Sequence, residues 1–587
     1  MNGTNHRPGA IHQGVPGAEG IAIGRVYVYN PEPVNIDRTP IDAAATAQEI
    51  GKLTAGIAVT KQQLLAVREA ALVKLGEAKA AIFDAHLLFL DDPAFTGEME
   101  QLIETRHFAA ALAVSTVTEE YAGMFKALED EYMRERAADI KDVGTRLLRN
   151  VLGLAPMGMA HLTGEVIVVA ADLTPSDTIT LNKKLVKGIA VDKGGPTSHA
   201  AIIARSLEIP AVLGLGDFSG QMQTGETIII DGTAGIVVAG PDAKQTDHYR
   251  RKAQDYQAAR AALEEVKDLP AVTGDGRRVE IAANIGTPED VPAVGRYGGE
   301  GVGLYRTEFL YMEKETLPDE EEQFAAYKAV AEALAGKPVI IRTMDIGGDK
   351  ELKSMDLPRE MNPFLGWRAI RICLSRPDIF KTQLRAILRA SQYGNVLIMY
   401  PMISGVGEVR EANAVLAQAK EELRREGVGF REDIRVGVMI EVPSAALTAD
   451  VIIKEVDFFS IGTNDLCQYT LAVDRMNEKI SHMYQPLHPA VLRLIKQTID
   501  AAHGQGKFAG MCGELAGDPA AAMILLGLGL DEFSMSAASM PRIKRIIRNV
   551  SYQEAQTAAR TALTFDTAEA VREYALRLLE IHEKMDR

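Results

Sequence analysis

Residues 194–205 place one histidine directly after a Gly-Gly-Pro turn and before a run of alanine and isoleucine. Pro196 followed by Ser198 predicts that a helix begins here. His199 would then lie beside unpaired backbone N–H groups at the positive end of the helix dipole. An imidazole in that position can carry a phosphoryl group whose oxygens accept from those donors. The alternative is an exposed histidine that only caps the helix.

Four arginines could hold a small anion. Arg306 and Arg342 each come at the end of a predicted strand, and Arg368 and Arg475 are on neighbouring loops. A guanidinium group matches phosphate oxygens better than an ammonium group does. Any one of these arginines could instead form a surface salt bridge. Four of them around one predicted site, in an acidic protein, favour an anion site.

Two carboxylates and one thiol complete the chemically useful set. Glu441 and Asp465 end adjacent predicted strands, so we expect their carboxylates to lie close together. Such a pair suits Mg²⁺, which takes few protein ligands, or general acid–base chemistry. Cys512 also ends a predicted strand and is either a proton donor or a buried, inert cysteine. No Cys/His cluster has the spacing of a structural zinc site.

The elements that must position these side chains form a repeating pattern in the C-terminal half. Eight short apolar runs are separated by helical stretches long enough for parallel crossovers, which predicts a (β/α)₈ barrel over residues 271–587. Asn284 and the polar residues above all follow such runs, and barrel active sites are built at strand C-terminal ends. The predicted strands are residues 279–283, 301–305, 339–341, 396–400, 436–440, 458–461, 508–511 and 532–535.

The N-terminal half has a different pattern. Strand-like runs at residues 17–29, 165–170, 187–192, 226–231 and 235–239 predict a small α/β domain made of residues 1–38 and 153–240. Between its two parts, residues 39–152 predict an all-helical subdomain. Residues 241–270 predict a linker that contains one long charged helix, over residues 242–267.

One stretch of the helical subdomain has two interpretations. Phe83, Asp84 and His86 lie among leucines and further acidic residues. They are either part of an ordinary helix with a core face, or a docking surface for a partner with a basic rim and an apolar centre.

Composition limits the possible functions. The chain has 587 residues, of which 47% are hydrophobic and 25% are charged, as in a globular protein of several domains. Its net charge of −16 argues against nucleic-acid binding. We expect no signal peptide and no membrane span, and three widely separated cysteines favour a cytoplasmic location.

Seven runs in this order resemble the enzyme I family of the bacterial sugar phosphotransferase system, the phosphoenolpyruvate–protein phosphotransferases. The resemblance extends from about residue 14 almost to the end of the chain. The matching runs are residues 194–205, 301–311, 342–350, 362–368, 441–445, 460–466 and 511–514.

The resemblance implies a fold and a mechanism. The α/β domain is expected to swivel, so that His199 receives the phosphoryl group of phosphoenolpyruvate in the barrel and passes it to the histidine carrier protein HPr. Thr178 would orient the imidazole of His199, and Cys512 would protonate the enolate to give pyruvate. Glu441 and Asp465 would bind Mg²⁺. The phosphoenolpyruvate-binding residues would be Arg306, Arg342, Arg368, Arg475 and Asn464.

The resemblance also implies partners. HPr would dock on the helical subdomain near Phe83, Asp84 and His86, although this region matches the family only loosely. The family is usually a homodimer through its barrels. The N-terminal extension, residues 1–13, is longer than the family pattern predicts, and we expect it to lack order.

Other functions fit less well. Pyruvate phosphate dikinase and phosphoenolpyruvate synthase share the histidine run, but they need a large ATP-binding domain for which the sequence before residue 194 leaves no room. An ATP-dependent signalling histidine kinase would need a nucleotide-binding glycine-rich segment, and we find none in this sequence. A non-catalytic scaffold would not need Cys512. The nitrogen-linked paralogue of enzyme I remains open.

Overall fold

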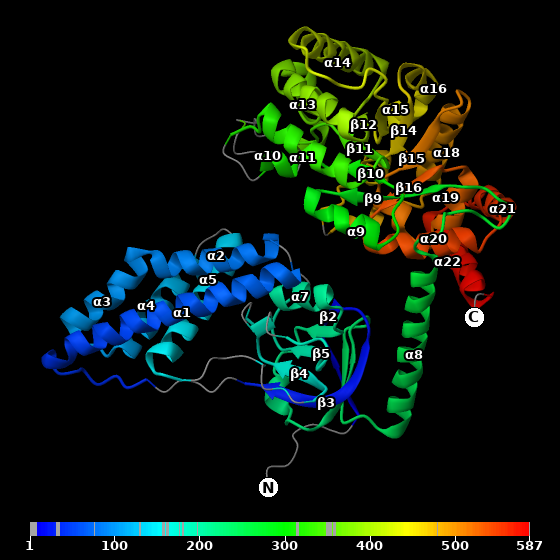
Figure 1. Ribbon diagram of the computed structural model, residues 1–587. Helices are drawn as coiled ribbons and strands as arrows, with labels where there is room; N and C mark the ends of the chain where they lie inside the picture. Colours follow the sequence, from blue (N-terminus) through cyan, green and yellow to red (C-terminus); the bar gives the residue numbers. More distant parts are fainter. Residues whose placement is uncertain are drawn as a thin grey trace. The chain divides into compact units, whose positions relative to one another are not determined.

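The computed structural model contains two compact units, Met1–Ala259 and Arg260–Arg587. It describes residues 9–30, 36–75, 77–127, 131–154, 159, 162, 164–174, 177–178, 181–195, 198–312, 316–347, 355, 360–477 and 479–585. Each unit is described by itself below, with the helices and strands labelled as in Figure 1.

The first unit contains one eight-stranded mixed sheet in the order β1-β8-β7-β3-β4-β5-β6-β2. Strands β3 to β6 are parallel neighbours, and the remaining pairings are antiparallel. The sheet confirms the α/β prediction and adds three short strands, β1, β2 and β6. Its strands are β1 (Ala10–Gln13), β2 (Val15–Ala18), β3 (Ile21–Tyr29), β4 (Val166–Ala170), β5 (Val186–Val191), β6 (Ala211–Leu213), β7 (Thr227–Asp231) and β8 (Ile236–Ala239).

The expectation that residues 1–13 lack order is wrong for their last part. Strand β1 pairs along its whole length with β8, from Ala10 opposite Ala239 to Gln13 opposite Ile236. The His12 ring also contacts the Phe218 ring edge-on, with 4.8 Å between centroids. Backbone pairing and one aromatic contact therefore order a segment whose composition is typical of a loop. Residues 1–8 lie outside the described part.

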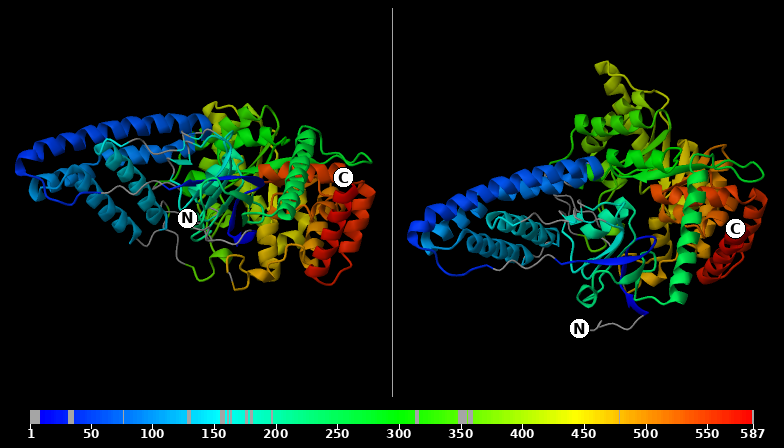
Figure 2. Two further views of the ribbon diagram at one scale, coloured as in Figure 1. Left: turned by 90° about the horizontal axis from the view of Figure 1, so that it is seen from below. Right: turned by 60° about the horizontal axis from the view of Figure 1, so that its bottom comes forward.

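In the described part of the chain between β3 and β4, five α-helices form the predicted helical subdomain. They are α1 (Thr46–Leu75), α2 (Glu77–Asp91), α3 (Pro93–Arg106), α4 (Ala110–Lys126) and α5 (Glu131–Val151). Both views in Figure 2 show the long helix α1 running along the subdomain. The helices enclose their own apolar core, which includes Phe95, Val114 and Ile140.

Helix α7 (His199–Leu207) connects this subdomain to the sheet. Ile203 belongs to the core of the helical subdomain, whereas Ala201 and Ala204 belong to the core beside the sheet. The small side chains of Ala201 and Ala204 allow close packing of α7 against the sheet. The helix that begins at His199 is thus held on two sides.

The second unit is a closed barrel of eight parallel strands, which confirms the (β/α)₈ prediction. Each predicted strand agrees with an observed one to within two residues at either end. The strands are β9 (Glu280–Ile285), β10 (Val302–Tyr305), β11 (Pro338–Arg342), β12 (Asn395–Tyr400), β13 (Val436–Ile440), β14 (Phe458–Ile461), β15 (Phe508–Met511) and β16 (Glu532–Met535).

Helices surround these strands and cover the barrel's outer face (Figure 1). They are α9 (Val291–Arg296), α10 (Phe309–Met312), α11 (Glu320–Ala333), α12 (Ile370–Ser375), α13 (Pro377–Ala390), α14 (Val406–Glu426), α15 (Pro443–Leu447), α16 (Ala449–Ile452), α17 (Thr463–Leu471), α18 (Pro489–His503), α19 (Ala522–Leu528), α20 (Met540–Arg548), α21 (Tyr552–Ala562) and α22 (Ala568–Met585). Among the helices that the structure describes, none has the length and apolar character that a membrane span needs.

The predicted linker helix is α8 (Ala243–Val266). Just after its end, the buried Lys544 ammonium donates to the carbonyls of Lys267 and Gly298, at 2.6 and 2.7 Å. A cation suits these carbonyls because Lys267 directly follows α8 and Gly298 closely follows α9, so each carbonyl lies at the negative end of a helix dipole. The second unit therefore fixes the residues that directly follow α8.

Candidate active site

A cavity of about 630 Å³ lies at the C-terminal ends of the barrel strands. Arg306, Glu441 and Cys512 directly follow β10, β13 and β15, and Arg342 is the last residue of β11. Asn464 and Asp465 belong to the first turn of α17. The cavity brings together every site residue predicted in the barrel: Arg306, Arg342, Arg368, Glu441, Asn464, Asp465, Arg475 and Cys512.

Asp345 links two of the arginines. Its Oδ2 lies 2.9 Å from Arg342 Nη1, and its Oδ1 accepts from Arg368 Nη2, also at 2.9 Å. Burial alone would lower the pKa of both arginines, but the carboxylate of Asp345 leads the opposing charges that hold these pKa values above normal. Two buried cations are thus kept charged and oriented at this cavity.

Further side chains that the sequence analysis missed support the same pair. Glu308 Oε1 accepts from Arg342 Nη2 at 2.7 Å, and the Tyr469 hydroxyl accepts from Arg368 Nη1 at 3.2 Å. Glu308 and Asp345 lie within runs that already carry an arginine, and this proximity is the signal that could have identified them. Tyr469 has no comparable signal, because it reaches Arg368 only through the fold.

The two predicted metal-binding carboxylates interact electrostatically. Burial first, and then the charges of Asp465 and Asp345, raise the pKa of Glu441 above its ordinary value. Asp465 is also paired, at 3.2 Å from Arg368 Nη2 and 3.8 Å from Arg475 Nη2. A cation between Glu441 and Asp465 would relieve their repulsion, so this donor set fits Mg²⁺.

The fit requires ligands besides these two. Within the described ranges, no group of three or more His, Cys, Asp and Glu side chains is arranged to hold a metal. Mg²⁺ commonly takes one or two carboxylates and completes its octahedron with substrate oxygens and water. The site therefore matches a cation that binds together with an oxygen-rich substrate.

Cys512 lies in the cavity wall with only 3% of its surface exposed. Burial raises the pKa of its thiol to about 11, so the thiol keeps its proton at neutral pH. A protonated thiol can act as an acid, whereas it is a poor nucleophile. The other two cysteines, Cys373 and Cys467, are also free and buried, and neither lines this cavity.

In the first unit, α7 begins at His199, as the sequence predicts. Ser198 caps the helix, with its hydroxyl accepting from the Ala201 backbone N–H at 3.4 Å. Thr178 is fully buried. The side chain of His199 lies outside the described part, so the orienting role of Thr178 stays a prediction.

The predicted docking residues need a correction. Phe83 and His86 have no exposed surface, because they pack into the core of the helical subdomain, and a buried side chain cannot contact a carrier. Asp84 is partly exposed and forms an ion pair with Arg68 at 2.6 Å. Leu88 is 68% exposed on the same helix. The outer face of α2 therefore presents Asp84 and Leu88, and it does not include the predicted Phe83 and His86.

Comparison with known proteins agrees with this geometry. Residues 260–552 match the family model "PEP-utilising enzyme, PEP-binding domain", residues 162–235 match "PEP-utilising enzyme, mobile domain", and residues 13–136 match "PEP-utilising enzyme, N-terminal". A phosphoenolpyruvate-protein phosphotransferase of Geobacillus stearothermophilus is 50% identical over 99% of this chain and 100% of its own. The chain belongs to the phosphoenolpyruvate-protein phosphotransferase family.

Two other members of the phosphoenolpyruvate-protein phosphotransferase family show the same likeness. One from Haemophilus influenzae is 50% identical over 94% of this chain and 96% of its own. One from Staphylococcus aureus is 48% identical over 95% of this chain and 98% of its own. The protein is therefore an enzyme of phosphoenolpyruvate-dependent phosphoryl transfer, as the resemblance implied.

Proposed function

We propose that the protein transfers the phosphoryl group of phosphoenolpyruvate to His199 and then to the histidine of the carrier protein HPr, and that it releases pyruvate. The main support is the barrel cavity, which combines four arginines, the carboxylates of Glu441 and Asp465, and a protonated thiol. Phosphoryl transfer depends mainly on positioning and on charge stabilisation, and this set of side chains supplies both.

The arginines hold the substrate. Arg342 and Arg368 are fixed by Asp345 before substrate arrives, so they need little reorganisation to receive phosphate and carboxylate oxygens. Arg306 and Arg475 add charge at the same cavity, and the Asn464 side chain adds an amide donor.

The chemistry uses two groups of this chain. The P–O bond of phosphoenolpyruvate breaks and an N–P bond forms on the imidazole of His199, while the electron pair stays on the enolate oxygen. Cys512 then gives its thiol proton to the enolate carbon, which yields pyruvate, and the thiolate regains a proton from water. Burial keeps Cys512 in the acid form that this step requires.

Glu441 and Asp465 would hold Mg²⁺ in this cavity. When bound, the cation would stabilise negative charge on the substrate oxygens. Asp465 contributes in a second way, because it also pairs with Arg368.

His199 and the barrel cavity belong to different compact units, so the reaction requires the first unit to bring His199 to the cavity. We therefore retain the predicted division into an α/β domain (1–38 and 153–240), a helical carrier-binding subdomain (39–152), a linker (241–270) and a barrel (271–587). HPr would dock on the helical subdomain at the outer face of α2, near Asp84 and Leu88.

The proposal also includes a homodimer through the barrels, as the family resemblance implies. Three free cysteines support a reducing compartment such as the cytoplasm.

The test is pyruvate release with and without HPr. Without carrier, the enzyme should release one pyruvate per His199 and stop, and HPr should restore continuous turnover. His199→Ala should release none. Continuous pyruvate formation without any carrier would contradict the proposed order of transfer.

A further inference from the structure

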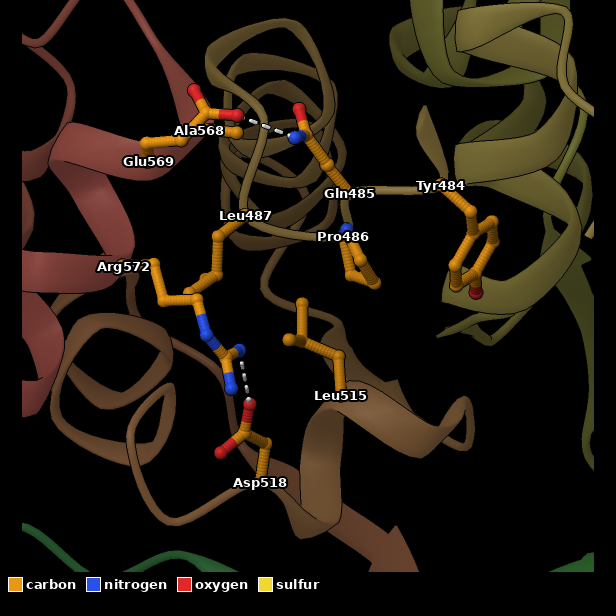
Figure 3. Close-up of a pocket in the computed structure, with 9 residues that line it drawn as sticks. All are labelled: Tyr484, Gln485, Pro486, Leu487, Leu515, Asp518, Ala568, Glu569 and Arg572. Carbon is orange, nitrogen blue, oxygen red and sulfur yellow. Dashed lines mark hydrogen bonds and ion pairs between the residues drawn. The ribbon is translucent and has the colours of Figure 1, made fainter. Parts of the chain in front are cut away.

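Two groups of polar side chains lie next to the active-site cavity in the barrel unit. The first surrounds a smaller cavity of about 260 Å³, and Tyr484 lines both cavities. Figure 3 shows the contacts there: Gln485 donates to Glu569 at 2.6 Å, and Arg572 lies 3.9 Å from Asp518. These four side chains pair with one another, and in the described part of the chain none of them bonds to an active-site arginine.

The second group is buried and centres on Gln383 of α13, which is 1% exposed. Its side-chain oxygen accepts from the Met344 backbone N–H at 2.8 Å. Its side-chain nitrogen donates to the Thr307 hydroxyl and to the Tyr327 hydroxyl, both at 3.1 Å. A glutamine side chain has one acceptor oxygen and two N–H donors, so Gln383 uses both donors and its acceptor.

Two of these partners belong to segments that carry active-site arginines. We call residues 306–308 the β10 end and residues 342–345 the β11 end. Thr307 directly follows Arg306 in the β10 end, and Met344 directly precedes Asp345 in the β11 end. The Thr307 hydroxyl also donates to the backbone carbonyl of Arg342 at 2.9 Å. One buried glutamine therefore joins the β10 end to the β11 end.

The same two segments carry the carboxylates that hold Arg342. Glu308, in the β10 end, accepts from Arg342 Nη2 at 2.7 Å. Asp345, in the β11 end, lies 2.9 Å from Arg342 Nη1. A movement of one segment relative to the other would pull these carboxylates apart and turn the guanidinium between them. A misplacement of about 1 Å in an active site can cost a large factor in activity.

The backbone ladder alone fixes these two segments less firmly than a regular ladder would. Strands β10 and β11 pair at Val302 with Val339 and at Tyr305 with Ile341, and the register shifts between these two pairs. An irregularity of this kind disrupts the ladder locally. The bonds through Gln383 join the two strands just beyond this irregularity.

We propose that Gln383 is a positioning residue for the phosphoenolpyruvate site, and that it holds the β10 end and the β11 end at the spacing at which Arg306 and Arg342 bind one substrate together. The inference rests on the proposed function of these two arginines. Gln383 is not among the described residues that line the cavity, so its effect on the reaction passes through Thr307 and Met344.

Steady-state kinetics of the full-length enzyme, with phosphoenolpyruvate as donor and HPr as acceptor, test this role. Thr307→Val keeps the shape of the side chain but removes the hydroxyl, and Gln383→Met keeps the length but removes the amide. Each should raise the KM for phosphoenolpyruvate about tenfold and change kcat by less than about threefold. Thr307→Ser keeps the hydroxyl and should have a KM within about twofold of the wild-type value. A KM in Thr307→Ser as high as in Thr307→Val would overturn the role of the hydroxyl bond.

Tyr327→Phe is the matched control for a general loss of core stability. It removes the third bond of Gln383 and the bond that the Tyr327 hydroxyl donates to Gln323 at 3.1 Å, but it leaves the bonds to Thr307 and Met344 in place. It should lower the melting temperature at least as much as Thr307→Val does and leave the KM within about twofold of the wild-type value. An equal rise in KM in Tyr327→Phe would overturn the positioning role, because loss of core stability would then explain all three variants.

The double variant of Gln383→Met and Thr307→Val gives a second, independent readout. Because both changes remove the same bond, together they should raise the KM about as much as the larger single change does. A rise of about 100-fold, the product of two separate effects, would mean that the two residues act independently and would overturn the proposed link.

Arg342→Gln separates this inference from the proposed function. If Arg342 holds phosphoenolpyruvate, this variant should raise the KM at least as much as Gln383→Met does. An unchanged KM in Arg342→Gln would overturn the proposed function of the arginine, and the positioning role with it. A raised KM in Arg342→Gln, together with a wild-type KM in Gln383→Met and Thr307→Val, would overturn the positioning role alone.

Discussion

Replacing Glu532 with glutamine should stabilise the barrel, increasingly so as pH rises. Glu532 lies inside the barrel, where it is 2% exposed and its Oε1 atom has no hydrogen-bond partner among the described residues. Because Gly303 has no side chain, it leaves room for the Glu532 carboxylate: a Cβ added at Gly303 would lie 2.2 Å from Oε1. Burial, and then the negative charges of Glu280 and Asp531, raise the pKa of Glu532 from 4.5 to about 8, against a smaller opposing effect of Arg435.

The size of the effect follows from that shift. Between pH 4.5 and 8 the unfolded chain gives up this proton and the folded chain keeps it, so the shift costs stability as pH rises. The cost is about 3 kcal/mol at pH 7 and reaches about 5 kcal/mol above pH 8. Glutamine is neutral at every pH, so Glu532→Gln removes this loss of stability. For a unit of roughly 330 residues, 3 kcal/mol corresponds to about 4 °C in melting temperature.

The assay is thermal unfolding of the wild type and Glu532→Gln at pH 5, 6, 7 and 8. The difference in melting temperature should be near zero at pH 5 and should grow to about 4 °C or more at pH 7 and 8. Glu321→Gln is the control, because Glu321 is a surface carboxylate whose pKa is lowered by Arg389. A gain that is the same at every pH, or largest at pH 5, would refute the reasoning.

Three further predictions concern the cavity. Cys512→Ala should slow pyruvate formation about 100-fold with little change in the KM for phosphoenolpyruvate, as steady-state kinetics would show, and unchanged turnover would remove the thiol from the proton-donor role. Asp465→Asn should make activity absent or insensitive to Mg²⁺ in an EDTA and Mg²⁺ titration, and a normal Mg²⁺ dependence would place the metal elsewhere. Asp345→Asn should raise the KM about 10-fold, because two buried arginines lose a charged hydrogen-bond acceptor. The surface variant Asp378→Asn should not change it, and equal KM values in the two variants would refute the positioning role.

The barrel could be predicted from sequence because its signals are local. Each strand is a short apolar run, and the runs that build the site end in a polar residue such as Arg306 or Glu441. Parallel strands in a closed barrel bring those ends to one face, so the position of each residue along its own strand was enough. The order of the strands along the chain then determined which of these side chains would be neighbours.

Other features depend on contacts between distant parts of the chain. Tyr469 on α17 meets Arg368, and Tyr484 from the segment between α17 and α18 lines the cavity, only because the chain after β14 folds back toward the barrel mouth. Phe83 and His86 lie on a helix with apolar residues on several sides, so the sequence did not separate its core face from its outer face. Strand β1 forms because β8 offers an open edge. None of these contacts leaves a pattern in the local sequence.

The most direct test of the central claim is incubation of the enzyme with labelled phosphoenolpyruvate or labelled ATP, with and without Mg²⁺, followed by acid treatment of the labelled protein. Our account predicts acid-labile label from phosphoenolpyruvate alone, dependent on Mg²⁺ and absent in His199→Ala. Label from ATP alone, or label that persists in His199→Ala, would contradict it.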